Sequence, residues 1–261
     1  MTVSWTFGGT ALTTYGRVTL FNDSYDITER RGGDILLPFQ HGQQFVQKYF
    51  DERRLAFTIK YQGASFSALE SNIDALKTLI APRTQQTLSQ TRSDATVRTI
   101  PAVVERPLQV DLSNGNNIAF FIIEFTCAFP FFRLSTAIAD NTTTINANPK
   151  AMTVTNPGTV EEMDATIILT GPLSNTVITN STNGYTLTYT GTISSPRVVT
   201  IQKSGREWIA TDDLGANKIS NITHSGGSTF MKFEPGANTL SIADSTHTTG
   251  TVKVTFNAPY L

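Results

Sequence analysis

The alternation of hydrophobic and polar positions predicts a long strand in the middle of the chain, from Ile118 to Phe132. Its odd positions are all apolar up to the end of the strand, as a strand face with a period of two requires. Its even positions are apolar as far as Ile122, and we expect Glu124 and Thr126 to face a wetter surface. The first half therefore needs cover on both faces, from a helix, a second sheet or another subunit. Pro130 has no N–H and ends the strand.

One amphipathic helix is predicted over residues 67–80, where apolar side chains recur with a period of 3.6 residues. Ser67 and Glu70 have the spacing of a capping box, in which the serine side chain accepts from the N3 amide and the glutamate reaches back. Pro82 stops the helix, since it disfavours helical backbone in the residue before it. A single helix in a strand-rich chain is best used as a lid over one face of a sheet.

The segments around this helix predict further strands. Leu55 to Tyr61 alternates as a half-buried strand does. Residues 103–112 are in strand phase and lead through the polar turn 113–117 into the long strand, which predicts a hairpin. Residues 83–100 are polar and rich in threonine, and fit either a long loop or a solvent-exposed pair of strands.

The second half reads as all-β, because short alternating segments are separated throughout by turns containing Gly, Pro or Asn. Short strands with a turn signal at every step are typical of a sandwich or jelly roll. The intervening stretch has no clear periodicity. We therefore predict a mainly β protein with one α-helix, divided into a first domain (1–134), a linker (135–150) and a second domain (151–261).

Composition and charge exclude several classes of protein. The chain has 20 Lys and Arg against 21 Asp and Glu; residues 1–140 carry 13 of each sign, and residues 141–261 carry 7 basic and 8 acidic side chains. Neither half has the basic excess of a tight nucleic-acid binder. The amino terminus lacks the pattern of a secretory signal, and no apolar run reaches the length of a membrane span. We expect a protein made in a cytoplasm that stays soluble or joins an assembly.

Candidate chemistry is sparse, and the sequence predicts no catalytic residue, cofactor or metal. Cys127, the single cysteine, lies in an apolar strand and is best read as a small hydrophobic residue. The three histidines are far apart and lack metal-ligand spacing. The adjacent carboxylates at 161–162 and 212–213 face opposite ways along a strand; a glycosidase pair brought together by the fold stays open as an alternative. Trp208 beside carboxylates could stack on a sugar ring, although a partly buried tryptophan is the more ordinary reading.

Positive signs point to assembly. Residues 33–42 form an apolar arm between glycine-bearing loops, which suggests packing against another surface. The same stretch lacks the lysine and the following helix that a glycine-rich phosphate site needs. Together with the long strand, which is apolar on both faces at its start, the arm favours contacts between subunits, and most homo-oligomers close symmetrically.

Short motifs in consistent order resemble the distal tail protein family of siphophages, the bacteriophages with long non-contractile tails. In the first half they are Phe125-x-Cys127-x-x-Pro130-Phe131-Phe132, and Arg31-x-Gly33-Asp34 followed by Pro38 and Gly42. In the second half they are Asn156-Pro157-Gly158-Thr159, Gly184-Tyr185-x-Leu187 and Phe233-x-Pro235-Gly236-x-Asn238-x-Leu240. The resemblance covers nearly the whole chain and rests on the order of these motifs.

The resemblance implies a fold and a role. Such proteins have a tail-tube-like β-domain with one helix and an extended hairpin belt, followed by a galectin-like β-sandwich at the periphery. They form a hexameric ring at the tail tip of the virion, made in the host bacterial cytoplasm. The ring joins the tail-tube protein to a fibre or lysin hub protein and to receptor-binding proteins. DNA passes through its channel without specific binding, and no membrane insertion is involved.

By position, the resemblance gives an assembly role in the belt to Arg31, Gly33, Asp34, Pro38 and Gly42. It makes Phe125 to Phe132 the motif that closes the first domain. It supplies no catalytic residue. Larger relatives carry inserted carbohydrate-binding modules, and the second half here is too compact to hold one.

Two alternatives remain beside a structural tail-tip hub. The chain could be a carbohydrate-binding adhesin that recognises host glycans through Trp208 or its neighbours. It could also be a tail-tube or other minor tail protein with the same first domain. Isolated short rings would favour the hub, stacked tubes the tube protein, and glycan binding abolished by Trp208→Ala the adhesin.

Overall fold

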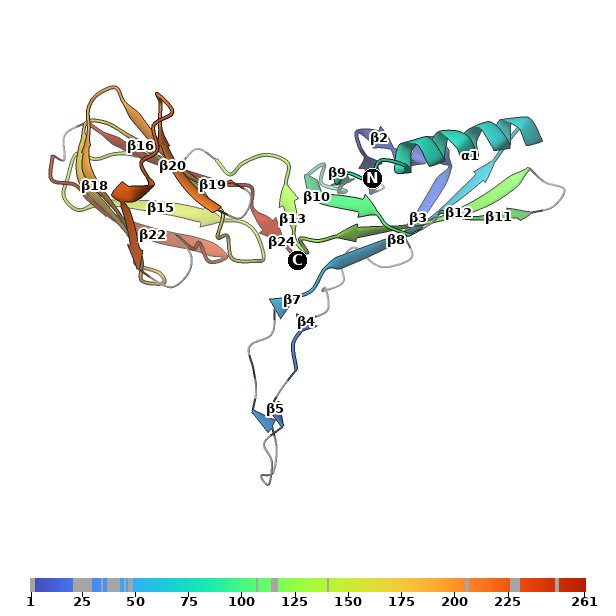
Figure 1. The fold of residues 1–261 in the computed structure, drawn as a ribbon, viewed down its shortest axis with the longest axis horizontal. Coiled ribbons are helices and arrows are strands. Elements are labelled where there is room, and N and C mark those ends of the chain that lie inside the picture. Colours follow the sequence, from blue (N-terminus) through green and yellow to red (C-terminus); the bar gives the residue numbers. More distant parts are fainter. Residues whose placement is uncertain are drawn as a thin grey trace. The chain divides into compact units, whose positions relative to one another are not determined.

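A computed structural model describes residues 3–20, 30–33, 35–36, 43–44, 46, 49–106, 108–113, 117–139, 141–204, 207–225, 231–246 and 249–261. The chain divides into two compact units, Met1–Ser135 together with Leu261, and Thr136–Tyr260 (Figure 1). Both units are built mainly from strands, and the described part of the chain contains one α-helix. The predicted fold class, mainly β with one helix, is confirmed.

The first unit is built on a sheet with the strand order β2-β1-β9-β10-β12-β8-β3, in which each neighbouring pair is antiparallel. Strand β11 pairs with β12, and β13 pairs with β10. The elements are β1 Ser4–Phe7, β2 Thr10–Ala11, the 3-10 helix η1 Leu12–Tyr15, β3 Arg17–Leu20, β8 Arg53–Gln62, α1 Phe66–Ile80, β9 Gln86–Thr91, β10 Val97–Val104, β11 Gln109–Ser113, β12 Ile118–Cys127 and β13 Phe132–Leu134.

The predicted long strand is β12, which pairs along its whole length with β8. Its odd positions from Ala119 to Cys127 are buried, and they form one face of the core. The expectation that Thr126 faces a wetter surface was wrong: Thr126 is 7% exposed, whereas Ile122 is 37% exposed. Thr126 lies opposite Val103 of β10, so a neighbouring strand shelters this end. The apolar side chains at the start of β12 are the ones left open to solvent.

The core of the first unit is aromatic. Trp5 packs edge-on against Phe57 with ring centroids 5.0 Å apart, and Phe57 meets Phe125 at 5.4 Å. Phe7 lies 4.8 Å from Phe125, and Phe132 lies 6.2 Å from Trp5. These side chains come from β1, β8, β12 and β13, so the core ties the amino-terminal strand to the last strand of the unit. Edge-on and tilted arrangements are the favoured geometries of aromatic pairs.

The helix α1 begins two residues earlier than the predicted capping box would place it. The N-cap is Ser65, whose hydroxyl oxygen accepts from the amide of Ala68 at 3.2 Å, so Ser67 lies inside the helix. Its end at Ile80, before Pro82, agrees with the sequence. Its buried side chains are Leu69 and Leu76. Figure 1 shows α1 on one side of the sheet, as a lid would lie.

The strands between the helix and β12 answer the alternatives left open by the sequence. Residues 83–100 contain β9 and the start of β10, which pair with each other, so the strand pair is right and the long loop is not. The pair is less exposed than expected, because Leu88 and Gln90 are buried. The predicted hairpin exists, but its first arm is two strands: β10 ends at Val104, and β11 begins at Gln109.

The second unit is a sandwich of two five-stranded antiparallel sheets, with orders β14-β23-β16-β19-β20 and β15-β22-β17-β18-β21. Alternating side chains of both sheets, such as Ile167, Ile201, Leu187 and Leu240, are fully buried. The strands are β14 Asn141–Thr144, β15 Lys150–Asn156, β16 Thr166–Thr170, β17 Leu173–Asn180, β18 Tyr185–Ile193, β19 Val198–Ser204, β20 Glu207–Asp212, β21 Ile222–Ser225, β22 Gly236–Ala243, β23 Thr251–Thr255 and β24 Pro259–Tyr260, with the 3-10 helix η2 Ile219–Asn221.

Part of the stretch that the sequence suggests as a linker, 135–150, is an edge strand. Strand β14 pairs with β23 over four residues, and the second compact unit begins at Thr136. The strand shows no hydrophobic alternation because it lies at the edge of its sheet and consists of Asn and Thr. Within the described residues, no helix is long and apolar enough to cross a membrane.

Candidate functional site

The predicted belt lies between β3 and β8. Strand β4 (Arg30–Arg31) pairs with β7 (Tyr49–Phe50), and β5 (Ile35–Leu36) pairs with β6 (Gln43–Gln44), each pair as a small sheet separate from the main one. Nested antiparallel pairs of this kind make a long hairpin, which we call the arm (Figure 1). The belt predicted from the resemblance is therefore a hairpin in its described parts.

The structure places only two of the five belt candidates. Arg31 lies on β4 opposite Tyr49 and is exposed. Gly33 is also exposed, and a side chain at this position would meet no neighbouring atom within 4 Å. The remaining candidates, Asp34, Pro38 and Gly42, lie outside the described residues. An assembly role for these five residues stays a prediction.

The base of the arm is joined to the end of β12 by aromatic contacts. The guanidinium carbon of Arg30 lies 5.3 Å from the ring centroid of Phe50, a favourable cation–π distance. The Phe50 ring meets Phe131 edge-on at 5.5 Å, and Phe131 meets Phe129 in the same way at 5.5 Å. Arg133 lies over the Phe129 ring at 5.4 Å. We call this set of five side chains the aromatic relay.

The motif expected to close the first domain falls into a buried part and a half-buried part. Phe125, Cys127 and Phe132 are buried in the core, and Pro130 is buried beside them. Phe131 is half-buried and belongs to the aromatic relay. Burial raises the pKa of the Cys127 thiol to about 12, although the positive charge of Arg53 acts in the opposite direction. The thiol is therefore protonated at neutral pH and packs as a small apolar group.

Arg53, at the start of β8, holds the buried part in place. Its side chain is only 4% exposed, and its Nε donates to the carbonyl oxygen of Pro130 at 2.8 Å. Its guanidinium also lies over the ring of Phe132, 5.3 Å from the centroid. Arg53, which follows the arm in the sequence, thus contacts Pro130 and Phe132 near the end of the first unit.

A second feature of the first unit is its pair of sheet edges. In the part β11-β12-β8-β3, the strands β11 and β3 are each hydrogen-bonded on one side only, among the strands that the structure describes. Arg17 lies opposite Lys60, Lys60 opposite Phe120, and Phe120 opposite Asp111. Residues directly opposite in antiparallel strands share a face. One row across the sheet therefore has an exposed cation at one edge and an exposed carboxylate at the other.

The same face carries the apolar side chains that β12 leaves uncovered. Ile122 is 37% exposed, and Phe120 is half-buried, with the Lys60 ammonium 5.7 Å from its ring centroid. Glu124 follows on this face and pairs with Arg106 at 2.8 Å and with Arg54 at 3.9 Å. Its carboxylate is thus neutralised within the chain.

In the second unit, Trp208 is half-buried on β20, opposite Lys203 of β19. Trp208 thus belongs to the second unit, whereas the described belt candidates Arg31 and Gly33 and the closing motif belong to the first. No group of three or more His, Cys, Asp and Glu among the described residues could hold a metal ion.

Sequence reasoning missed the side chains that connect the arm to the core. Arg53 and Phe50 were unassigned, because a cation and an aromatic residue beside a strand have many ordinary uses. A signal was nevertheless present: Arg53 occupies a position in phase with the buried residues Leu55 and Phe57 of β8. A charged residue on the buried face of a strand needs a partner, which indicates a specific polar contact.

The fold and these contacts define a class of protein in which a β unit with one helix and an arm precedes a β-sandwich. Residues 157–260 match the family model described as "Siphovirus-type tail component, C-terminal domain". This match lies within the second unit, and the resemblance to siphophage tail proteins read from the sequence is confirmed.

A solved structure agrees with this chain in fold. The chain is similar to the crystal structure of the SPP1 Dit (gp 19.1) protein, described as a paradigm of hub adsorption apparatus in Gram-positive infecting phages. The TM-score is 0.74 at 14% identity, with 100% of both chains covered. The similarity to the phage P2 baseplate in its activated conformation has a TM-score of 0.47 at 10% identity, again over the whole of both chains. No curated protein matches this sequence.

Proposed function

We propose that this protein is a structural, non-enzymatic component of a phage tail tip, which forms a hexameric ring between the tail tube and the adhesion apparatus. The fold likeness to SPP1 Dit and the tail-component domain over 157–260 support the assignment to a tail. The ring would hold the tail-tube protein on one side and a fibre or lysin hub protein on the other. Receptor-binding proteins could join it, and DNA would pass through its channel without being gripped.

The observation that best supports the ring is a row of residues that lie opposite one another across the sheet: Arg17, Lys60, Phe120 and Asp111. A ring needs a head-to-tail contact, in which one surface of a subunit meets a different surface of the next. Here the two surfaces are the edge strands β3 and β11, and the row ends in a cation on one and a carboxylate on the other. Opposite charges facing each other favour the correct partner and suppress pairing of like edges.

The strand directions allow the sheet to continue from one subunit to the next. The four strands β11, β12, β8 and β3 alternate in direction, since each neighbouring pair is antiparallel. Strand β3 therefore runs opposite to β11. When β3 of one copy lies beside β11 of the next, their pairing is again antiparallel, and closing a sheet removes its exposed edges.

Charge reversal at the two edges tests the ring. We expect Arg17→Glu and Asp111→Arg, each alone, to lower the fraction of ring in native mass spectrometry and negative-stain images. The double variant restores opposite charges across the contact and should recover ring formation. Lys77→Glu is the matched control because it lies on α1 and not on either edge strand, and it changes the net charge by the same amount as Arg17→Glu.

The proposal fails if the unmodified chain stays monomeric at every concentration, alone and with the tail-tube protein added as a template. It also fails in its choice of edges if the single variants form rings as well as the control does. Stacked tubes instead of short rings would favour a tail-tube protein.

The two compact units are proposed to serve as two domains, with the first forming the ring and the second lying at its periphery. The arm, including Arg31 and Gly33, is proposed as the belt that reaches a neighbouring subunit. The exposed position of both residues supports this role, since neither has a core to fill. Deleting residues 32–44 should weaken the ring in the same mass-spectrometric assay while leaving the main sheet folded.

A further inference from the structure

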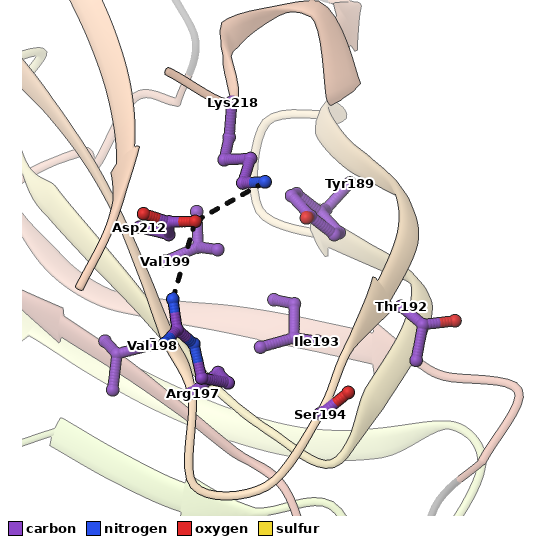
Figure 2. A pocket seen from close by; sticks show the side chains of 9 residues that line it. All are labelled: Tyr189, Thr192, Ile193, Ser194, Arg197, Val198, Val199, Asp212 and Lys218. Atoms are coloured by element: carbon purple, nitrogen blue, oxygen red, sulfur yellow. Dashed lines mark ion pairs between the residues drawn. The ribbon is translucent and has the colours of Figure 1, made fainter. Parts of the chain in front are cut away.

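A small polar cleft lies in the second unit, beside the ends of β18, β19 and β20 (Figure 2). Its volume is about 230 Å³, and its polar lining includes Tyr189, Thr192, Ser194, Arg197, Asp212 and Lys218. Sites for drug-sized ligands occupy roughly 300–1,000 Å³. The volume therefore suits one small ligand. The polar lining suits a ligand with many polar groups.

Asp212 is held rigidly at one side of this cleft. Its Oδ1 accepts from the amides of Leu214 at 3.0 Å and Ala216 at 2.8 Å, so the turn after β20 fixes the carboxylate. The hydrogen bond from the Ala216 amide is the largest cause of a lowered pKa, supported by the Leu214 amide and by Lys218 and opposed by partial burial. The carboxylate is ionised at neutral pH and is positioned before any ligand arrives.

The other oxygen of Asp212 meets two cations at long range. Its Oδ2 is 3.4 Å from the Lys218 ammonium and 3.7 Å from Nη2 of Arg197, and Figure 2 shows the two side chains approaching it from different sides. Hydrogen bonds between nitrogen and oxygen usually span about 2.7–3.2 Å. Arg197 instead directs its Nε to Asp213 at 3.0 Å. Oδ2 can therefore accept a further hydrogen bond, and the ammonium has donors to spare.

This arrangement selects for a hydroxyl group over a charged one. The two cations and two carboxylates of the cluster cancel, so neither an anion nor a cation gains a net attraction. A hydroxyl can donate to Oδ2 of Asp212 and at the same time accept from Lys218 or Arg197, which no simple ion can do. Among the other lining residues, Ser194 adds a hydroxyl, whereas Figure 2 shows the hydroxyl of Thr192 directed away from Asp212, and this hydroxyl lies 3.5 Å from that of Ser174.

We propose that this cleft binds a single sugar residue through neighbouring hydroxyl groups, with Asp212 as the acceptor and Lys218 and Arg197 as donors. This activity goes beyond ring assembly and does not depend on it, because every residue involved lies in the second unit. It also differs from sugar stacking on Trp208, which does not line the cleft.

Titration of the full chain with the methyl glycosides of glucose, galactose, mannose and N-acetylglucosamine tests the proposal. Protein amide shifts and saturation transfer to the ligand would be followed by NMR. We expect at least one glycoside to bind with a Kd of about 1 mM, the range of a small ligand held by a few polar contacts, and to shift the amide signals around Arg197 and Lys218.

Asp212→Asn keeps an oxygen for the Leu214 and Ala216 amides but replaces the acceptor Oδ2 by a donor. We expect it to weaken binding about tenfold or more, as the loss of a hydrogen bond to a charged group does. Lys218→Met should weaken binding similarly. Lys203→Met is the matched control, since Lys203 pairs with Asp164 at 2.8 Å and does not line the cleft.

Three results would overturn the proposal. One is that none of the four glycosides shifts the cleft signals at roughly 10 mM, well above the expected Kd. Another is that Trp208→Ala abolishes binding whereas Asp212→Asn retains it, which would assign the sugar to Trp208. The last is that inorganic phosphate shifts the same signals and the glycosides do not, which would define an anion site. Ring formation by Asp212→Asn should equal that of the unmodified chain, so failure here is distinguishable from failure of the ring.

Discussion

Arg53 donates from its Nε to the carbonyl oxygen of Pro130, 77 positions further along the chain, at a distance of 2.8 Å. Arg53 comes just after the arm in the sequence. Pro130 lies in the turn after β12, the strand that pairs along its whole length with β8. Because the guanidinium also covers the ring of Phe132, one buried side chain connects a strand, a turn and the aromatic core.

Replacing this side chain should destabilise the first unit. We expect Arg53→Met to lower the free energy of unfolding by about 2 kcal/mol, because the buried Pro130 carbonyl loses a charged donor. Arg53→Lys should not restore it, since an ammonium lacks the planar group that donates and stacks at once. Urea unfolding followed by Trp5 fluorescence, in a Trp208→Phe background, measures this unit alone.

Arg54→Met is the control for that measurement. Arg54 is the next residue, and its side chain is 52% exposed, paired with Glu52. Exposed ion pairs contribute little to stability, so we expect a change within about 0.5 kcal/mol. Equal losses for the two variants would show that the buried contact to Pro130 contributes nothing of its own.

The aromatic relay makes a separate prediction about the base of the arm. Phe50 and Phe131 meet edge-on, so Phe50→Ala and Phe131→Ala should together cost less than the sum of their separate effects. A double-mutant cycle should give a coupling free energy of about 1 kcal/mol, as measured for aromatic pairs. Strict additivity within the error of the cycle would mean that the rings do not interact in solution.

The helix start distinguishes the structure from the sequence prediction. In the structure Ser65 is the N-cap, whereas the sequence favoured a capping box that begins at Ser67. Ser65→Ala should therefore lower the free energy of unfolding by about 1 kcal/mol, and Ser67→Ala should change it little. The reverse order in urea unfolding would restore the box proposed from sequence.

This difference shows which features a sequence specifies and which it leaves ambiguous. The buried face of β8, the interior of α1 and the hairpin into β12 follow from side-chain periodicity, because burial of one face imposes that period. Helix caps and sheet edges do not follow from this periodicity. Two serines two residues apart can each begin a helix, and which one does depends on the packing of Leu69 and Leu76.

The candidate site was harder to predict than the fold. The motif from Phe125 to Phe132 is visible as an apolar run, but its partners Phe50 and Arg53 lie about 80 residues earlier. The row from Arg17 to Asp111 depends on the register of three strand pairs, and a slip of one residue would place its members on opposite faces. Periodicity within one segment carries no information about contacts between distant segments or about the register between strands.

A buried carboxylate makes the stability of the second unit depend on pH. Asp244 is 1% exposed. Burial is the largest single influence on the pKa of its carboxyl group and raises it. The hydrogen bonds from Thr246, Thr176 and the Ser174 amide together outweigh burial, so the pKa is lowered overall. A carboxyl with a lowered folded pKa stabilises the fold above its unfolded pKa of about 3.9 and loses that contribution as pH falls through the folded value.

The free energy of unfolding of this unit should therefore fall as pH is lowered below about 4, and Asp244→Asn should flatten part of that fall. At neutral pH the same variant should cost about 2 kcal/mol, because charge-assisted bonds are lost. Trp208 fluorescence in a Trp5→Phe background reports on this unit. An unchanged pH profile in Asp244→Asn would assign the acid sensitivity to other carboxylates.

Ile122 and Ile123 are neighbours on opposite faces of β12, and they separate folding from assembly. Ile123 is 1% exposed and Ile122 is 37% exposed. Ile123→Ser should lower the free energy of unfolding by about 3 kcal/mol or more, since it removes core packing and buries a hydroxyl. Ile122→Ser should leave the monomer nearly as stable as before. If the proposed ring covers this face, Ile122→Ser should nevertheless reduce the ring fraction in native mass spectrometry. A ring that forms equally well with serine at 122 would mean that this apolar face stays open to solvent in the assembly, and that the charged edges alone join the subunits.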